Sequence, residues 1–201
     1  MEYIGSVAAL EALYGAPGQA ATVKVTPGLT PAYRAWIARS RLCILTTVGP
    51  EGTDASPRGD DGPVVQILDA QTLLLPDWKG NDRIDSLRNI VRDPRVSLMF
   101  LIAGSNNVMR VNGTARLTAD AEVLARFERD GKRPRSVAVV AVTEVYSQCA
   151  RALLRARIWS DGDQAAGLPS VGDMLREITE GGIDGTAYDA DWPVRAAGTM
   201  W

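Results

Sequence analysis

The chain has 201 residues, of which 46% are hydrophobic and 23% are charged, so it can bury one sizeable core. Its formal net charge of −2 lacks the global positive field that nucleic-acid binding usually needs. The absence of histidine excludes Ser-His-Asp hydrolysis, Cys-His nucleophiles, His-rich zinc sites and axial histidine ligation of haem. Any chemistry is therefore expected to come from a bound organic cofactor.

Cysteine usage and hydropathy indicate the cellular setting. Cys43 and Cys149 lie in apolar segments without the spacing of a metal site or a disulfide framework, which fits a reducing compartment. No apolar run approaches the ~20 residues of a membrane helix, and the first residues lack the basic start of a signal peptide. We expect a cytoplasmic protein with no membrane or nucleic-acid partner.

The first forty residues are expected to form short helices. Helical spacing predicts a helix over residues 6–14, with Ser6 as its N-cap. A second helix is predicted to begin at Thr30 and Pro31, since proline is favoured at the first helical position. Residues 15–29, rich in glycine and proline, are interpreted as a linker.

The middle of the chain is dominated by predicted strands. Short apolar or alternating runs bounded by turn residues predict strands at 42–48, 53–57, 64–68, 72–75, 95–102, 108–118 and 136–146. Tight turns between the first four favour an antiparallel meander. The expected fold class is mainly β: a small barrel with peripheral helices, because closure removes exposed sheet edges. A sandwich is the competing architecture.

The stretch 72–90 is interpreted as a buried strand, a loop and then a helix. Pro76 is expected to end the strand, because proline cannot donate to a sheet ladder. Helical periodicity begins after Gly80, with Asn81 or Asp82 as the predicted N-cap. The first turn of a helix has free N–H groups and a partial positive charge, which favour an anion.

Basic residues surround this predicted helix start. Lys79 and Arg83 bracket it, and Arg58 lies in a similar loop punctuated by glycine and proline. Cations beside free N–H groups suggest a bound phosphate. The alternative is a solvated surface on which the cations are neutralised by nearby carboxylates, namely Asp77, Asp82 and Asp85.

Further helices are predicted between the last two strands and after them. They begin at Asp120, span 148–157 and span 170–179, whereas residues 181–201 are aperiodic and read as a packed or partly mobile tail. We therefore expect a single domain over 1–201, with an N-terminal extension at 1–40 and a C-terminal extension at 160–201.

Six short strings carry a resemblance to a known family. They lie at residues 56–60 (SPRGD), 73–77 (LLLPD), 80–87 (GNDRIDSL), 93–96 (DPRV), 110–113 (RVNG) and 149–153 (CARAL). The chain resembles the FMN-binding split-barrel family related to pyridoxamine 5'-phosphate oxidase, in its bacterial branch of about this length. The similarity extends from the N-terminal helix to about Trp159.

The resemblance implies a homodimer of split β-barrels with FMN in two symmetric clefts at the subunit interface. It assigns the phosphate to three basic residues, Arg58, Lys79 and Arg83, assisted by Ser56, Asn81 and Ser86. It places the isoalloxazine against the backbone around Val65 and against Pro76 and Asp77. It takes the remaining contacts from the partner's Cys149, the partner's Arg151 and the partner's Trp159. Arg110, on the polar face of its strand, is a further candidate contact.

The chain departs from the family pattern at several positions. The branch usually has a histidine before the cysteine and a lysine two residues after it, where this chain has Gln148 and Arg151. Asp82 places a carboxylate beside the expected phosphate loop. The vitamin-B6 oxidase itself uses an arginine-histidine pair, which a chain without histidine cannot form. Oxidation of pyridoxamine phosphate is therefore not expected.

The functional prediction is an FMN-dependent oxidoreductase acting on an unknown small molecule. The alternatives are a split-barrel reductase that binds the deazaflavin F420, a haem protein with a Cys, Met or Tyr ligand, and a flavin-binding protein without turnover. No catalytic residue is assigned, since Asp60, Arg110 and Arg151 are interpreted mainly as structural. Cys149 is interpreted as a packing residue on an apolar face.

Overall fold

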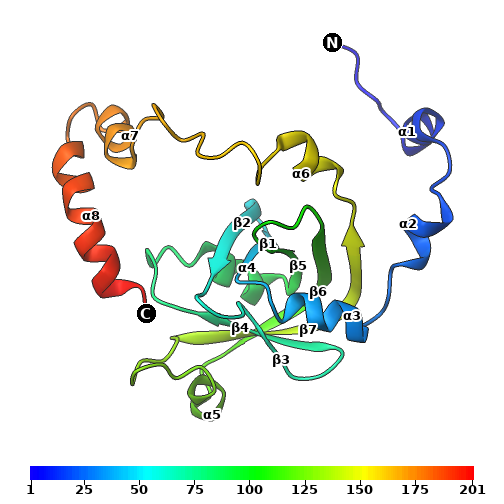
Figure 1. The fold of residues 1–201 in the computed structure, drawn as a ribbon, viewed down its shortest axis with the longest axis horizontal. Coiled ribbons are helices and arrows are strands. Elements are labelled where there is room, and N and C mark those ends of the chain that lie inside the picture. Colours follow the sequence, from blue (N-terminus) through cyan, green and yellow to red (C-terminus); the bar gives the residue numbers. More distant parts are fainter.

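The computed structural model describes residues 1–201 and contains one curled, seven-stranded antiparallel sheet with helices around it (Figure 1). The mainly β prediction is confirmed. The strands, in chain order, are β1 (Leu42–Gly49), β2 (Gly52–Gly59), β3 (Gln66–Ile67), β4 (Thr72–Asp77), β5 (Arg95–Leu101), β6 (Val108–Thr118) and β7 (Ser136–Gln148). Their order across the sheet is β2-β1-β5-β6-β7-β4-β3, so β2 and β3 form its two edges.

The predicted meander of the first four strands is wrong. β1 pairs with β2 and β3 pairs with β4, as tight turns require, but β2 and β3 lie at opposite edges. The apolar strands β1 and β4 each need a second neighbour, and β5 and β7 supply it from later in the chain. Turn residues specify adjacent pairs only, so they could not reveal these long-range pairings.

Pro76 does not end its strand, as the sequence had suggested. It lies within β4, in register with Val137 of β7. β3 pairs only with Leu73 and Leu74, so Pro76 has a neighbouring strand on one side alone. Proline is tolerated at such an edge position because its missing N–H leaves no ladder bond unmade.

The core lies on the inner face of the curled sheet. The predicted alternation of β6 is confirmed, because Met109, Val111 and Ala115 are buried while the residues between them are more exposed. β6 and β7 pair along most of their length, with a register shift at Gly113. A Cβ at Gly113 would lie 2.1 Å from the Ala141 carbonyl oxygen, so glycine is required for this close approach.

The helices are α1 (Val7–Tyr14), α2 (Gln19–Val23), α3 (Pro31–Ile37), α4 (Asp85–Arg92), α5 (Ala121–Ala125), α6 (Arg151–Ala156), α7 (Val171–Ile178) and α8 (Gly185–Thr199). Ser6 caps α1 and Thr30 caps α3, as predicted. The linker interpretation of 15–29 missed the single helical turn of α2. None of these helices is long and apolar enough to cross a lipid bilayer.

The aperiodic tail predicted after residue 181 is instead helix α8, which pairs with α7 as a hairpin set apart from the sheet (Figure 1). The helix escaped detection because it has no apolar stripe and contains Pro193. Its start is capped by Asp184. The two helices approach closely at Gly172 and Gly185, where a Cβ on either would lie within 2.2 Å of the other's carbonyl oxygen.

Candidate functional site

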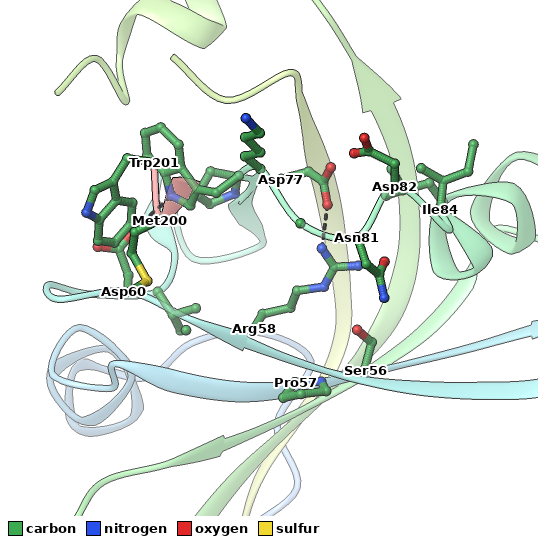
Figure 2. Close-up of a pocket in the computed structure, with 17 residues that line it drawn as sticks. Ser56, Pro57, Arg58, Asp60, Asp77, Asn81, Asp82, Ile84, Met200 and Trp201 are labelled. Atoms are coloured by element: carbon green, nitrogen blue, oxygen red, sulfur yellow. Dashed lines mark hydrogen bonds and ion pairs between the residues drawn. The ribbon is translucent and has the colours of Figure 1, made fainter. Parts of the chain in front are cut away.

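A cavity of about 490 Å³ lies between β2, the loop from β4 to α4, and the residues that follow α8 (Figure 2). This volume is within the roughly 300–1,000 Å³ typical of small-molecule sites. Its lining includes six of the predicted site residues, namely Ser56, Arg58, Pro76, Asp77, Lys79 and Asn81. The structure therefore brings together residues from two separate sequence motifs.

Arg58 and Asp77 face each other across the ionic end of the cavity (Figure 2). The Arg58 Nη1 donates a hydrogen bond to Asp77 Oδ1, and both side chains are largely buried. The Nε of Arg58 is also buried but has no hydrogen-bond partner. A guanidinium has five N–H donors, so Arg58 keeps capacity for an anionic ligand. Lys79 also lines the cavity and has no ion-pair partner.

The start of α4 differs from the prediction. Its N-cap is Ile84, in the left-handed conformation at φ 53°, and no side chain caps the helix. Asn81 instead accepts a hydrogen bond from the Arg83 backbone N–H, and Asp82 pairs with Arg135 at 2.8 Å. Predicting the N-cap at Asn81 or Asp82 was therefore wrong. Because no side chain occupies them, the first N–H groups of α4 remain available to an anion.

A smaller hollow of about 250 Å³ adjoins this end and shares Ser56, Arg58 and Asn81 with the cavity. It also contains Arg83 and Ser86. Of the carboxylates predicted to neutralise the cations, Asp85 does so in this hollow. Arg83 Nε donates to Asp85 at 2.8 Å, and the Ser86 hydroxyl donates to Asp54 at 2.5 Å. Lys79 is thus the cation of this region that no carboxylate engages.

The opposite end of the cavity is aromatic. Trp78 and Trp201 meet edge to face, with ring centroids 5.4 Å apart. The guanidinium of Arg129 lies 4.2 Å from the centroid of Trp201. Asp60, whose side chain is 7% exposed, accepts hydrogen bonds from Trp78 Nε1 at 3.0 Å and from Arg129 Nη2 at 3.0 Å. The buried carboxylate therefore fixes both groups.

The carboxylates of Asp60 and Asp61 keep Arg129 positively charged beside the Trp201 ring. Burial lowers the pKa of Arg129, but the attraction of Asp60 and Asp61 outweighs it, so the pKa is raised above its ordinary value. Arg129 therefore stays protonated and remains a cation behind the Trp201 ring.

Trp201 and Met200 are lining residues that the sequence did not reveal. No motif covers the end of the chain, and α8 lacks the periodicity that would have placed a helix there. The nearest signal was the presence of three large aromatic residues, Tyr188, Trp192 and Trp201, in a segment without periodicity.

Other predicted site residues lie away from this cavity within one chain. Val65 is buried and lines a second cavity of about 530 Å³, which shares the Asp60 and Trp78 wall. Arg110 lies over the Tyr146 ring at 5.4 Å, and Trp159 donates to the Ser105 carbonyl at 2.8 Å.

The predicted helix over 148–157 begins later, at Arg151, so Cys149 precedes it. Cys149 is exposed, and its interpretation as a packing residue is therefore wrong for the single chain. Cys43, by contrast, is fully buried in β1 directly opposite Arg58 of β2. Burial raises the pKa of the Cys43 thiol to about 12, partly offset by the positive charge of Arg58.

Residues 29–149 match the sequence profile of the family described as pyridoxamine 5'-phosphate oxidase, which is well over half of the chain. The chain belongs to this family. The matched segment contains the whole sheet of the pyridoxamine 5'-phosphate oxidase fold and the ionic end of the cavity. The hairpin of α7 and α8, with Trp201, lies outside it. No curated protein matches the chain.

Several solved structures of related folds resemble this chain. HupZ of Group A Streptococcus is 15% identical, with a TM-score of 0.49 over 59% of this chain and 93% of that one. An FMN-binding protein of Syntrophomonas wolfei is 14% identical, with a TM-score of 0.43 over 56% and 79%. The FAD binding protein of Mycobacterium smegmatis is 15% identical, with a TM-score of 0.42 over 61% and 97%.

Proposed function

We propose that the protein is an FMN-binding flavoprotein and acts as an FMN-dependent oxidoreductase on a small molecule. One observation carries the proposal: in a member of this family, Arg58, whose buried Nε has no hydrogen-bond partner, lines a cavity that Lys79 and the uncapped start of α4 also border. A phosphate monoester suits these donors, because it is dianionic and accepts several charge-assisted hydrogen bonds.

The other residues of the cavity also fit a flavin. Ser56 and Asn81 add neutral hydrogen-bonding groups at the ionic end, and the two tryptophans offer flat apolar surface at the other end. The carboxylate of Asp77 would repel an anionic ligand, but its ion pair with Arg58 already neutralises this negative charge.

When bound, FMN would supply hydride or electron transfer. The residues of this chain would bind it, orient it and exclude water. Both buried carboxylates of the cavity are engaged, Asp77 by Arg58 and Asp60 by Trp78 and Arg129. We therefore assign binding roles to these residues and no proton transfer to Asp60 or Asp77.

We also propose that the protein is a homodimer in which Cys149, Arg151 and Trp159 of one subunit border the flavin of the other. The exposed helix α1 supports association, because none of its residues is buried and Leu13 and Tyr14 are 69% and 80% exposed. Apolar residues on such a helix are typical of an interface. Sedimentation velocity tests this directly: a dimer that the Leu13→Asp variant shifts toward monomer supports it, and a monomeric wild type contradicts it.

The decisive experiment is the visible absorption spectrum of the purified protein, before and after adding FMN or F420 and removing the excess. Retained FMN bands that fade in the Arg58→Ala and Lys79→Ala variants support the proposal. Arg92→Ala is the matched control, since Arg92 pairs with Glu51 on the exposed side of α4, outside the cavity. Retention of F420 alone, or of neither cofactor, contradicts the proposal.

Turnover is tested separately by adding NADH or NADPH to the FMN-loaded protein under anaerobic conditions. Bleaching of the flavin bands, followed by their return with an acceptor, supports the oxidoreductase assignment. A flavin that stays oxidised with both nucleotides indicates a binding protein without this activity.

A further inference from the structure

The aromatic end of the cavity is built by a part of the chain that the family match does not include. The matched residues end at 149, whereas Trp201 follows α8 of the hairpin. Figure 2 shows Trp201 and Met200 beside Asp60, at the end of the cavity opposite Ser56 and Asn81. The cavity therefore has an ionic end supplied by the sheet and an aromatic end completed by the hairpin.

The position of Trp201 is fixed by contacts with the sheet-bearing part of the molecule. Its ring packs against Arg129 and meets Trp78 edge to face, and the buried carboxylate of Asp60 holds both partners. The hairpin is itself specifically built: Asp189 of α8 accepts hydrogen bonds from Ser170 and from the Gly172 N–H. Trp201 is consequently a defined wall of the cavity, although its side chain is only half-buried.

We propose that Trp78 and Trp201 form a subsite for the planar ring system of the bound ligand, and that Trp201 is a specificity-determining residue carried by the α7–α8 hairpin. The inference rests on the proposed function, under which the ring is the isoalloxazine of FMN. It moves that ring to the tryptophans from Val65, Pro76 and Asp77, where the family resemblance placed it. Indole surfaces favour planar, electron-poor heteroaromatic rings through stacking and apolar burial. The ionic end would anchor the phosphate, so the two ends together set the direction in which the ligand lies.

This arrangement predicts that the two ends act on different parts of the ligand. Riboflavin has the isoalloxazine ring and the ribityl chain of FMN but lacks the phosphate. A residue at the ring end should therefore affect FMN and riboflavin equally. A residue at the phosphate end should affect FMN alone.

The test measures the dissociation constants of FMN and riboflavin for the wild type and for Trp201→Ala, Trp201→Phe and Lys79→Ala. Trp201→Ala is expected to weaken both ligands by the same factor, about three- to tenfold, with Trp201→Phe between it and the wild type. Lys79→Ala is expected to weaken FMN only. Trp192→Ala is the matched control, because Trp192 lies on α8, is 53% exposed and does not line the cavity.

The outcomes separate this inference from the proposed function. A wild type that binds FMN with an affinity unchanged in Trp201→Ala overturns the aromatic subsite and leaves the flavin assignment intact. Equal losses in Trp201→Ala and Trp192→Ala also overturn it, because they would reflect damage to the hairpin. A wild type that binds riboflavin as tightly as FMN overturns the phosphate assignment alone, and one that binds neither ligand overturns both.

Discussion

Arg58 donates from Nη1 to Asp77 while its buried Nε has no hydrogen-bond partner. A buried guanidinium with an unsatisfied donor is destabilising unless something else completes it. Arg58 is therefore a paired cation with one unsatisfied donor, in the wall of a cavity that Lys79 also lines. Under the proposed function, an anionic ligand adds hydrogen bonds to this guanidinium while Asp77 stays paired with it.

Replacing Asp77 with asparagine should change both the stability of the protein and its affinity for FMN. The Asp77→Asn variant leaves the positive charge of Arg58 without its counter-charge, so the ligand-free protein should melt at a lower temperature. The same change removes a carboxylate from the phosphate end, so FMN should bind more tightly, by about three- to tenfold. Differential scanning fluorimetry and fluorescence titration measure the two effects.

Glu51→Gln is the control for this variant. Glu51 pairs with exposed Arg92, does not line the cavity and is 72% exposed, so its charge is screened by water. It should change both quantities only slightly. FMN affinity that falls in Asp77→Asn would contradict the role given to the pair.

The hairpin provides a second prediction through its glycines. Gly172→Ala places a Cβ 2.1 Å from the Gly185 carbonyl oxygen, so the two helices must separate. The variant should lose riboflavin and FMN affinity to the extent that Trp201→Ala does, because Trp201 would no longer be held in place. Limited proteolysis should cut within residues 157–170 faster than in the wild type.

Gly198→Ala is the matched change on the same hairpin. A Cβ at Gly198 meets nothing within 4 Å, and alanine favours a helix over glycine by roughly 1 kcal/mol. This variant should keep both affinities and resist proteolysis at least as well as the wild type. Equal sensitivity of the two variants would show that the glycine contact does not hold the hairpin together.

The sequence predicted the elements better than their arrangement. Caps at Ser6 and Thr30 and the alternation of β6 are local signals, and the structure confirms them. The pairings of β1 with β5 and of β4 with β7 depend on contacts between distant segments, which no local pattern encodes. Pro76 was misread for this reason, since its tolerance depends on which side of β4 lacks a neighbour.

The residues of the candidate site also divide into those that a local sequence pattern predicts and those that depend on tertiary packing. Arg58 and Lys79 were identified because cations beside loops and free N–H groups form a local pattern. The pairing of Arg58 with Asp77 and the engagement of Ser86 by Asp54 depend on tertiary packing. Trp201 could not be placed at all, because it reaches the cavity only through the hairpin.

The buried thiol of Cys43 should make the stability of the protein depend on pH. This thiol has a pKa of about 12 in the folded protein against an ordinary value of 9.0, so the folded state binds more protons between these values. The resulting stabilisation is fully present below pH 9.0 and is lost as the pH rises toward 12. The free energy of unfolding should fall by up to ~1.4 kcal/mol per pH unit in this window.

Urea denaturation between pH 8 and 11 measures this slope. Other groups also titrate there, so the comparison is with the Cys43→Ala variant. The difference in unfolding free energy between wild type and variant should shrink as the pH rises. A difference that stays constant would contradict burial as the cause.

The two cysteines should also differ in reactivity. Exposed Cys149 should react readily with a disulfide reagent at pH 8, whereas Cys43 should react only after unfolding. Counting released thiolate in native and denatured protein gives one and then two groups per chain. The Cys149→Ser variant should show no native reaction. If Cys149 borders the partner subunit's flavin, as proposed, saturating FMN should slow its labelling in the wild type.

The hairpin of α7 and α8 is joined to α6 through residues 157–170, which form no helix or strand. The two ends of the cavity thus belong to pieces that are connected loosely along the chain. Under the proposed function, a ligand bound at both ends would be released in two stages: its ring when Trp201 separates from Arg129 and Trp78, and its phosphate afterwards. Its residence time would then be governed by opening of the hairpin, so that affinity and off-rate could be adjusted by changes far from any atom that touches the ligand.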